Sequence, residues 1–360
     1  MILRGILVSY LSRQFLTRVL AALFAFTALL QLLDLLDAAS DVLERGGGVG
    51  DIAYYALLRL PVIMDRVLPL AVLMGALLTL LGLAQNNEIV ALKSAGLTPY
   101  RLLGVLAPAA VGIGLFHFVL ADQVVPRAER AFLSWWQESN PPGEEAERGK
   151  PVWLRAGGTI LRVDRVLDRG RRLEGVELYP RDAAGRMQER ITAGAATFED
   201  GAWTLIGAQR VGLRAGGGTE IRREARLPWD LTLHPTNVVE VAAPTEKVPA
   251  HRLRTILSGD WSGSNSPAYY RTRLHKTYSG PLASLIMLLL AAPVAHGMRR
   301  SGNLAGGLTV GIVAGLLYLL TDGMLAALGE AGAMPAAMAA WGPTALFASI
   351  GAAIMVHVEG

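Results

Sequence analysis

A short polar segment that follows a long apolar stretch has the residue types of a recognition helix. Asn86 or Asn87 can cap the start of such a helix, and the carboxylate of Glu88 suits its positive first turn. Gly96 can adopt the left-handed conformation that ends a helix, and Pro99 prevents its continuation. The segment is therefore predicted to be a short helix whose two ends are both specified.

The chemistry open to this helix is binding rather than catalysis. Ile89 and Leu92 give it a small apolar face beside the charge of Glu88. A helix of this type either lies on a bilayer surface or fills a groove in a partner protein. A plain interfacial turn is the simpler alternative, and it is compatible with the same periodicity.

Residues that could support catalysis or bind a metal are scattered along the chain. A phosphate-binding loop needs a glycine, four residues and then Gly-Lys-Ser/Thr, whereas residues 143–151 have five intervening residues and end in proline. The six histidines include no pair at i,i+4 spacing, and the sequence contains no cysteine. We therefore predict no catalytic residue, no metal site and no cofactor bound by this chain.

The composition excludes an ordinary soluble domain. Of the 360 residues, 52% are apolar and 18% are charged, against about 25% charged residues in typical soluble proteins. Residues 122–276 hold 44 of the 64 charged residues, so the distribution predicts two membrane blocks around one water-soluble insert. The formal net charge of +4 comes without a block of five basic residues, so we expect no nucleic-acid partner.

Stretches long enough to cross a bilayer, about 20 residues each, occur in both blocks. The predicted spans of this polytopic α-helical protein are 14–36, 55–85, 102–121, 277–298, 303–326 and 336–357. The predicted parts are an N-terminal membrane half at 1–131 with the short helix at 86–96, an insert at 132–265, and a C-terminal membrane half at 266–360. The first span could instead be a cleaved signal peptide, but its apolar stretch is too long for one.

Basic residues flanking the spans predict which side of the membrane each end occupies. One side carries Arg4, Arg13, Arg18, Lys93, Arg101, Arg299 and Arg300. The opposite short loops carry Arg45, with Arg59 and Arg66 at the entrance to the second span. Because six spans place both termini on one side, we expect cytoplasmic termini and an insert outside the cytoplasm.

The insert changes from helical runs to short alternating segments. Turn formers such as Gly157-Gly158 and Asp200-Gly201 separate these segments. The alternating segments are 152–154, 160–163, 173–179 and 203–206. We predict an all-β domain that is jelly-roll-like, although periodicity does not distinguish a jelly roll from other sandwiches. A short helix is expected at 249–257, and a solvated strand face is expected to carry Arg162, Arg165, Arg222 and Arg226.

The fifth predicted span combines small residues with one acidic side chain. Gly307, Gly311 and Gly315 lie at i,i+4 spacing, which permits close approach of another helix. Asp322 lies late in the span, where an ionisable group either faces a cavity or marks the outer interface. These four residues are therefore candidates for helix packing and for a gate.

Two parts of the sequence together resemble the YjgP/YjgQ permease family of lipopolysaccharide export, and its LptG branch more than its LptF branch. The first part comprises residues 68–78, LPLAVLMGALL, and residues 87–97, NEIVALKSAGL. The second part comprises Leu233-His234-Pro235, then Tyr270, Lys276 and residues 281–287, PLASLIM. The resemblance covers essentially the whole chain, including three spans, a β domain and three more spans.

The resemblance implies a half-transporter in the bacterial inner membrane, with a periplasmic β domain. Its partners would be a paired LptF-like permease, an LptB-like ATPase homodimer, an LptC-like single-span protein and a periplasmic LptA-like bridge. Lipopolysaccharide would be the cargo, and ATP and Mg²⁺ would be used by the partner ATPase rather than by this chain. The residues that match the family's ATPase-docking coupling helix are Asn87, Glu88, Ile89, Leu92, Ala95, Gly96 and Leu97.

One departure from the family concerns the cargo. Members often place lysines at the outer end of the first helix, where they meet lipid A phosphates, but Asp34 and Asp41 occupy those positions here. That role therefore does not transfer to this chain. If phosphates are bound, the candidate cations at a suitable depth are Arg45, Arg59 and Arg66.

Two alternatives remain open at this stage. One is a mechanotransmission subunit of another exporter, in which the β domain is a lever and no lipid enters the spans. The other is an intramembrane lipid-modifying enzyme with Asp34, Asp37 or His117 as catalytic groups. The enzyme would need paired catalytic groups, and the sequence offers neither a G-x-S-x-G motif nor a metal-binding pair.

Overall fold

The computed structural model contains two compact units. The membrane unit comprises residues 1–132, 247–250 and 271–360, and the β unit comprises residues 133–246 and 251–270. The structure describes all residues except 1, 45, 87, 89–90, 92–93, 95–98, 139–150, 157, 183–185, 214–218, 230–232, 243–246, 259–264, 302–303 and 360.

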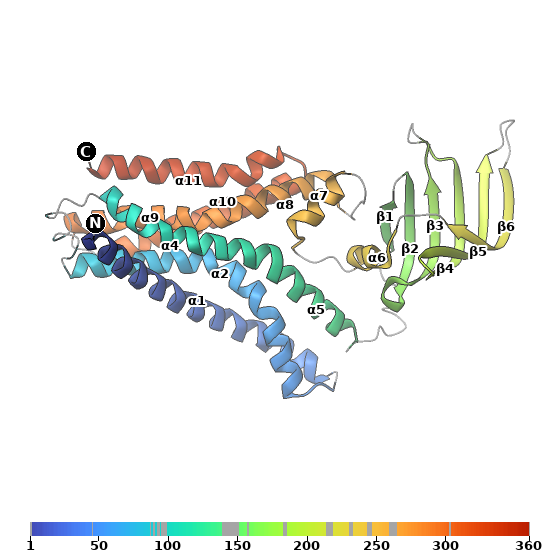
Figure 1. Cartoon of the computed structure of the whole chain (residues 1–360), viewed down its shortest axis with the longest axis horizontal. Coiled ribbons are helices and arrows are strands. Elements are labelled where there is room, and N and C mark those ends of the chain that lie inside the picture. The colour runs from blue at the N-terminus through green and yellow to red at the C-terminus, as the bar shows by residue number, and fades with distance from the viewer. Residues whose placement is uncertain are drawn as a thin grey trace. The chain divides into compact units, whose positions relative to one another are not determined.

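Two long helices, α1 (Ile2–Glu44) and α2 (Val49–Gln85), follow one another in the membrane unit and pack together (Figure 1). Pro61 and Pro69 both lie inside α2. Each proline lacks the N–H that an uninterrupted helix needs, which accounts for the change of direction along the α2 ribbon. Both helices are longer than the spans predicted at 14–36 and 55–85, because regular helix continues beyond the apolar stretch.

The contact between α1 and α2 is built from residues four apart on α1. A side chain at Gly75 would overlap Val19, so the absence of a Cβ on α2 lets the two helices approach closely. Near one end of the contact, the Arg18 guanidinium donates to the carbonyl oxygen of Leu78 at 2.5 Å and lies against Gly82. The buried residues at this spacing are Leu11, Phe15, Val19, Leu23 and Thr27, and Ala38 and Val42 are buried further along the helix.

The third long helical segment consists of α4 (Pro99–Val119), a π-helical turn η1 (Leu120–Val124) and α5 (Val125–Glu138). Pro126 has no N–H to offer to the carbonyl of Asp122, four residues earlier, so the regular α-helical ladder cannot continue there. The wider turn at this point bonds the N–H of Val125 to the carbonyl oxygen of Leu120. Asp122 lies within this turn.

The remaining helices of the membrane unit come after the β unit in the chain. They are α8 (Pro267–Ser279), the 3-10 turn η3 (Gly280–Leu282), α9 (Ala283–Ser301), α10 (Leu304–Glu330) and α11 (Ala336–Glu359). Within the described residues, five helices are long and apolar enough to cross a membrane, namely Leu7–Glu44, Val49–Gln85, Tyr100–Trp136, Leu308–Glu330 and Ala336–His357. The predicted span 277–298 is not among these five, although it is helical on both sides of η3.

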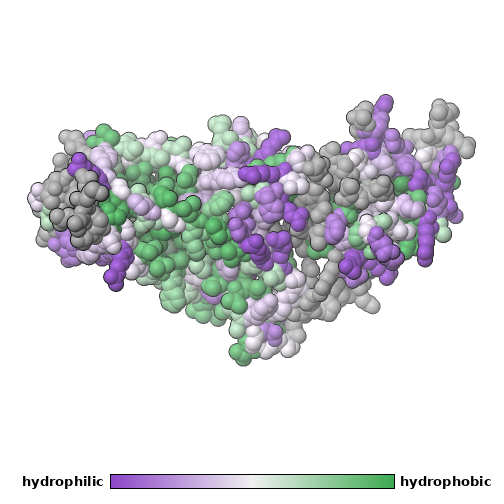
Figure 2. All heavy atoms as spheres, viewed as in Figure 1, coloured by the Kyte–Doolittle hydropathy of each residue, from purple (hydrophilic) through white to green (hydrophobic). Residues whose placement is uncertain are grey.

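The helix α2 lies at the centre of the membrane unit. In its most apolar window 72% of the residues are buried, compared with 17% in α1 and in α10. Figure 2 shows apolar side chains gathered over the helices of this unit and hydrophilic side chains over the strands of the β unit. This contrast confirms the predicted combination of a polytopic membrane protein and an inserted β domain.

The β unit contains six described strands in one antiparallel sheet, and each strand pairs with the next one in the chain (Figure 1). They are β1 (Val152–Ala156), β2 (Thr159–Leu167), β3 (Arg172–Pro180), β4 (Glu189–Glu199), β5 (Ala202–Leu213) and β6 (Thr219–Trp229). The four alternating segments seen in the sequence lie in β1, β2, β3 and β5. The sequence did not indicate β4, because its alanines, glycine and threonines give little alternation of hydropathy.

One face of this sheet is apolar and buried. Leu154, Leu161, Leu178 and Ile191 are cross-strand neighbours on β1 to β4, and all four are buried. The indole of the buried Trp203 on β5 donates to the carbonyl oxygen of Leu233 at 2.6 Å. This bond fastens the chain beyond β6, just before the short helix α6 (Pro235–Ala242), to the sheet.

The chain re-enters the membrane unit at 246/247 and leaves it again at the start of α7 (Ala250–Ser258), which corresponds to the short helix predicted at 249–257. The first residue of α7, Ala250, belongs to the membrane unit and its remaining residues belong to the β unit. The chain also passes between the units within α5, at 132/133, and within α8, at 270/271. These three crossings lie inside helices, whereas the crossing at 246/247 comes before α7.

Candidate functional site

The predicted recognition helix is described only in part. Glu88, Ala91 and Ser94 are helical, and the Ser94 hydroxyl donates to the carbonyl oxygen of Ala91 at 2.9 Å. Glu88 is half-buried, whereas Ala91 and Ser94 are exposed. The other residues assigned to this helix lie outside the described residues, namely Asn87, Ile89, Leu92, Ala95, Gly96 and Leu97.

The first candidate cation, Arg59 on α2, is already engaged by α1. Its Nη2 lies 2.9 Å from Oδ1 of Asp34 and its Nε lies 3.3 Å from Oδ2, so the pair is two-pronged. The guanidinium also lies over the ring of Phe132, 5.6 Å from the centroid, and that ring meets Tyr55 edge-on at 5.5 Å. Arg59 is thus oriented by a carboxylate and an aromatic ring, and both side chains of the ion pair retain about a fifth of their exposure.

The other two candidate cations differ from Arg59. Arg66 is exposed on α2, and its positive charge acts on Asp34 together with that of Arg59. Arg45 lies outside the described residues. Among the described residues, then, the structure brings Arg59 and Arg66 into one electrostatic neighbourhood around Asp34.

A second charged cluster lies nearly two turns further along α2, at Asp65. The Asp65 carboxylate is only 5% exposed, and it contacts Nε2 of His117 at 3.3 Å and the ammonium of Lys247. His117 lies near the end of α4 and is itself only 8% exposed. A buried carboxylate is costly unless a cation or hydrogen bonds compensate for its charge, and Lys247 supplies the cation.

Two further carboxylates contact the same returning segment. The backbone N–H of Lys247 donates to Oε2 of Glu129 on α5 at 3.1 Å. The backbone N–H of Ala250 donates to Oδ1 of Asp122 at 2.7 Å. Sequence analysis did not single out Lys247, Glu129 or Asp122, because their proximity depends on how a segment more than 100 residues later in the chain returns to these helices.

The gate candidate Asp322 on α10 is paired as well. Its carboxylate contacts the ammonium of Lys276 on α8, and both side chains are about four-fifths buried. Two turns further along α10, Glu330 contacts Arg273, which is one turn before Lys276 on α8, at 2.7 Å. The two ion pairs therefore run in parallel between the same two helices.

The glycines of α10 lie on a helix that contacts α2 and α9. A side chain at Gly315 would overlap the buried side chain of Leu73 on α2 and would come within 3.6 Å of the Met287 sulfur on α9. Gly311 is buried one turn earlier. Gly307 is helical, but its surroundings lie outside what the structure describes.

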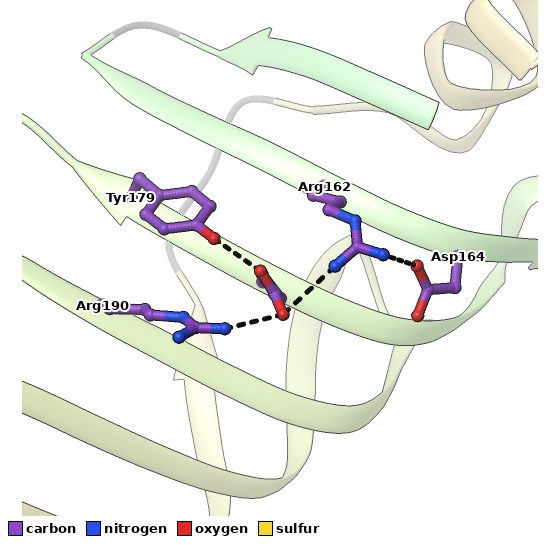
Figure 3. Close-up of polar contacts among 5 residues, drawn as sticks. Arg162, Asp164, Tyr179 and Arg190 are labelled. Carbon is purple, nitrogen blue, oxygen red and sulfur yellow. Dashed lines mark hydrogen bonds and ion pairs between the residues drawn. The ribbon is translucent and has the colours of Figure 1, made fainter. Parts of the chain in front are cut away.

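The exposed face of the β sheet carries a polar network (Figure 3). The Tyr179 hydroxyl donates to Glu177 at 2.5 Å, Arg190 donates to the same carboxylate at 2.9 Å, and Arg162 contacts it at 3.3 Å. Arg162 also pairs with Asp164 at 2.8 Å. The hydrogen bond from Tyr179, with help from Arg190, holds the pKa of Glu177 below its ordinary value, and the same bond raises the pKa of Tyr179.

The chain is similar to a family of known proteins along nearly its whole length. A family model described as "Lipopolysaccharide export system permease LptF/LptG" matches residues 9–357. The chain belongs to this family. Membership confirms the resemblance noted in the sequence, and it places the chain among permease subunits rather than enzymes. Together with its long apolar helices, membership makes the chain a multi-pass protein of the inner membrane.

Curated relatives of this permease are LptG proteins. The "Lipopolysaccharide export system permease protein LptG" of Escherichia coli (strain K12) is 22% identical over 345 residues, covering 95% of this chain and 96% of the relative. The LptG of Haemophilus influenzae (strain ATCC 51907) is 22% identical over 342 residues, covering 94% of both chains. The similarity therefore extends over both membrane halves and the insert.

Proposed function

We propose that this chain is the LptG-type permease subunit of an ATP-driven exporter that extracts lipopolysaccharide from the inner membrane. The single observation that carries the proposal is the family match from residue 9 to residue 357. That match covers nearly the full length of the five long apolar helices found among the described residues, and the whole inserted sheet. The mechanotransmission subunit and the lipid-modifying enzyme are not favoured, because the family is one of lipopolysaccharide export permeases.

The proposed route of the lipid begins between the spans and continues into the β unit. Positive charge in the short loops favours cytoplasmic termini and a periplasmic β unit. In this orientation the β unit would receive the lipid and pass it to a periplasmic LptA-like bridge. The two-sided character of the sheet, with one apolar and one charged face, suits a module that meets acyl chains on one side and water on the other.

The proposed membrane partner is an LptF-like permease that faces α1 and α10. Both helices expose large apolar side chains, including Phe24 on α1 at 77% and Val310 on α10 at 65%. Lipid and a second membrane protein are the two environments that tolerate such surfaces. An LptC-like single helix is the further partner proposed for this side of the complex.

The proposed energy source is an LptB-like ATPase homodimer that binds ATP and Mg²⁺. The helix around Glu88 would dock on it, with Glu88 contacting a basic residue of the ATPase. Substituting Glu88 by alanine is then expected to reduce co-purification of the ATPase, whereas the control Ser94→Ala leaves co-purification unchanged. Equal recovery of the ATPase with both variants would contradict the assigned docking role.

The proposed contact with lipid A phosphates uses Arg59 and Arg66, with Arg45 as the third candidate. Arg59 is oriented by Asp34 and Phe132 but retains exposure, so a phosphate could take the place of Asp34. Arg59 would then lose its charge-assisted contact with Asp34 and gain one with the phosphate.

The decisive test of the proposed function is photo-crosslinking. A photoreactive residue placed at exposed positions of α1 and α10, such as Phe24 and Val310, should capture lipopolysaccharide in cells. The capture should depend on ATP hydrolysis by the partner, and probes in the β unit should label later than probes in the helices. Efficient coupling of ATPase to export without any lipid captured from the helices would favour the mechanotransmission subunit instead.

A further inference from the structure

The segment Lys247–Ala250 is held by side chains from three elements of the membrane unit. The cluster comprises Asp65 on α2, Asp122 in η1 and Glu129 on α5, and the term "return clamp" refers to these three carboxylates with the segment they bind. We infer that the return clamp is a positioning device that transmits movement of α2 and of the α4–α5 segment to the two ends of the β unit.

The burial of the carboxylates shows that these contacts belong to the packed interior. The Asp65 side chain is 5% exposed, and Glu129 as a whole is 8% exposed. Charges at such depth cost several kcal/mol of desolvation each unless they are compensated. Lys247 compensates Asp65 through its ammonium and meets Glu129 through its backbone N–H, so one residue serves two carboxylates on different helices.

Asp122 supplies the negative charge that the first turn of α7 lacks. The first turn of α7 contains no acidic residue, although the free N–H groups and positive end of a helix favour an anion there. Asp122, 128 residues away in sequence, accepts the N–H of Ala250 instead. Asp122 lies in the π-helical turn η1, so a carboxylate from this irregular segment meets the start of α7.

The position of the clamp in the chain gives it its role. Glu129 lies three residues before the chain leaves the membrane unit at 132/133, and Ala250 is the last residue before the chain leaves it again at 250/251. The bond between Lys247 and Glu129 therefore joins the outgoing and returning chain at the base of the insert. A displacement of α2 at Asp65, or of η1 at Asp122, must move both chain segments together while the clamp holds.

The environment of the clamp favours a permanent link over a switch. His117, near the end of α4, contacts the same Asp65. A small apolar cluster of Val62, Leu120 and Val125, with Met64, lies on α2, η1 and α5, the elements that carry the three carboxylates. Breaking one partner of such a buried pair leaves an uncompensated charge, whereas replacing both partners by neutral groups does not. The neutral pair D65N/K247M is thus the variant that removes the ionic link with the least damage to folding.

The inference rests on the proposed function, so the test is made on the complete exporter in proteoliposomes, with lipopolysaccharide release and ATP hydrolysis measured together. The readout is lipopolysaccharide released per ATP hydrolysed. D65N/K247M should lower this ratio by roughly three- to thirtyfold while ATP hydrolysis continues, which is the range expected for coupling carried by a few contacts. The control R186Q, which removes an exposed ion pair of the β unit, should leave the ratio unchanged.

Asp122 provides a second, independent variant. D122N keeps an acceptor for the N–H of Ala250 and should retain more of the release ratio than D122A, which has none. An unchanged ratio in both D65N/K247M and D122A would overturn the clamp. Failure of the unmodified complex to release lipopolysaccharide would instead overturn the proposed function, so the two failures are distinguishable.

Because the chain contains no cysteine, a cross-link can be placed without reaction at any other residue of this chain. D122C combined with A250C, joined by a short thiol-reactive cross-linker, should retain the release ratio, because the clamp stays closed through the cycle. Loss of release on cross-linking, restored by cleaving the linker, would show that the segment must detach and would contradict a permanent link.

Discussion

Arg59 on α2 and Asp34 on α1 form a two-pronged ion pair, with Nη2 2.9 Å from Oδ1 and Nε 3.3 Å from Oδ2. The pair has a consequence for cargo binding, because the cation that a lipid phosphate would meet is already neutralised by the neighbouring helix. Binding of a phosphate to Arg59 therefore requires release of Asp34. Its release would remove the contact between α1 and α2 that this ion pair makes.

The first prediction follows from this competition. R59Q should reduce lipopolysaccharide crosslinking from α1 by roughly three- to tenfold, because the phosphate loses a charge-assisted hydrogen bond of about 1.5–3 kcal/mol that is partly offset by the contact with Asp34. D34N should increase crosslinking, because Arg59 then lacks its competing carboxylate. D37N, an exposed aspartate on the same helix, is the matched control and should behave like the unmodified protein. If R59Q and D37N capture lipid equally well, Arg59 is not part of the cargo site.

The second prediction concerns two glycines of α10. G315A should lower the free energy of unfolding by about 1–3 kcal/mol, because the added methyl group would overlap the fully buried Leu73. G323A should raise it by about 0.5–1 kcal/mol, since no atom lies within 4 Å of the added group and alanine favours the helix. Thermal unfolding in detergent, followed by tryptophan fluorescence, measures both changes. A similar shift in the same direction for the two variants would contradict close packing at Gly315.

The fold was largely predictable because its signals are local. Uncharged stretches of about 20 residues indicate membrane helices by themselves, and alternation in 173–179 indicates a strand without knowledge of its neighbours. The strand β4 was missed because Ala193, Ala195 and Ala196 face both sides of the sheet with little contrast in hydropathy. Its assignment depends on the strands beside it rather than on its own residues.

The sequence could place single residues of the candidate site, but it could not predict which residues pair with one another. The proximity of Arg59 to the outer end of α1 could be estimated from depth in the membrane, but its partner Asp34 could not, because the pairing depends on the rotation of two helices about their axes. The same holds for Lys247, which precedes a predicted helix and carries no other local signal. Contacts between segments 182 residues apart arise from packing, which periodicity does not encode.

The third prediction tests the ion pair between α8 and α10. K276M should lower the free energy of unfolding by about 1–3 kcal/mol, because the carboxylate of Asp322 loses its partner while remaining largely buried. The double variant K276M/D322N should be less destabilised than K276M alone, since no uncompensated charge is left. R186Q is the comparison, because its exposed pair with Asp182 should contribute less than about 1 kcal/mol. Additive losses in the double variant would mean that the two side chains do not interact.

The last prediction concerns the pH dependence of the exposed network around Glu177. Its pKa is lower in the folded chain than the ordinary value of 4.5, because Tyr179 and Arg190 donate hydrogen bonds to the ionised carboxylate. The contribution to stability is therefore fully present above pH 4.5 and is lost as the pH falls through the folded value. The pKa of Tyr179 is raised above 10.0, so its contribution is lost only at still higher pH. Between these limits the network should be at its strongest.

The measurement compares the unmodified chain with E177Q by hydrogen exchange of the β3 amides, corrected for the pH dependence of intrinsic exchange. The difference in protection should correspond to about 1 kcal/mol or less near neutral pH, because the partner Arg190 is half-exposed and solvent screens its contact with the carboxylate. It should shrink steadily below pH 4.5, where the carboxylate of the unmodified chain becomes protonated and resembles the amide. E199Q, at the exposed end of β4, should show no such dependence. A difference that stayed constant or grew on acidification would mean that the ionised form of Glu177 is not what the network stabilises.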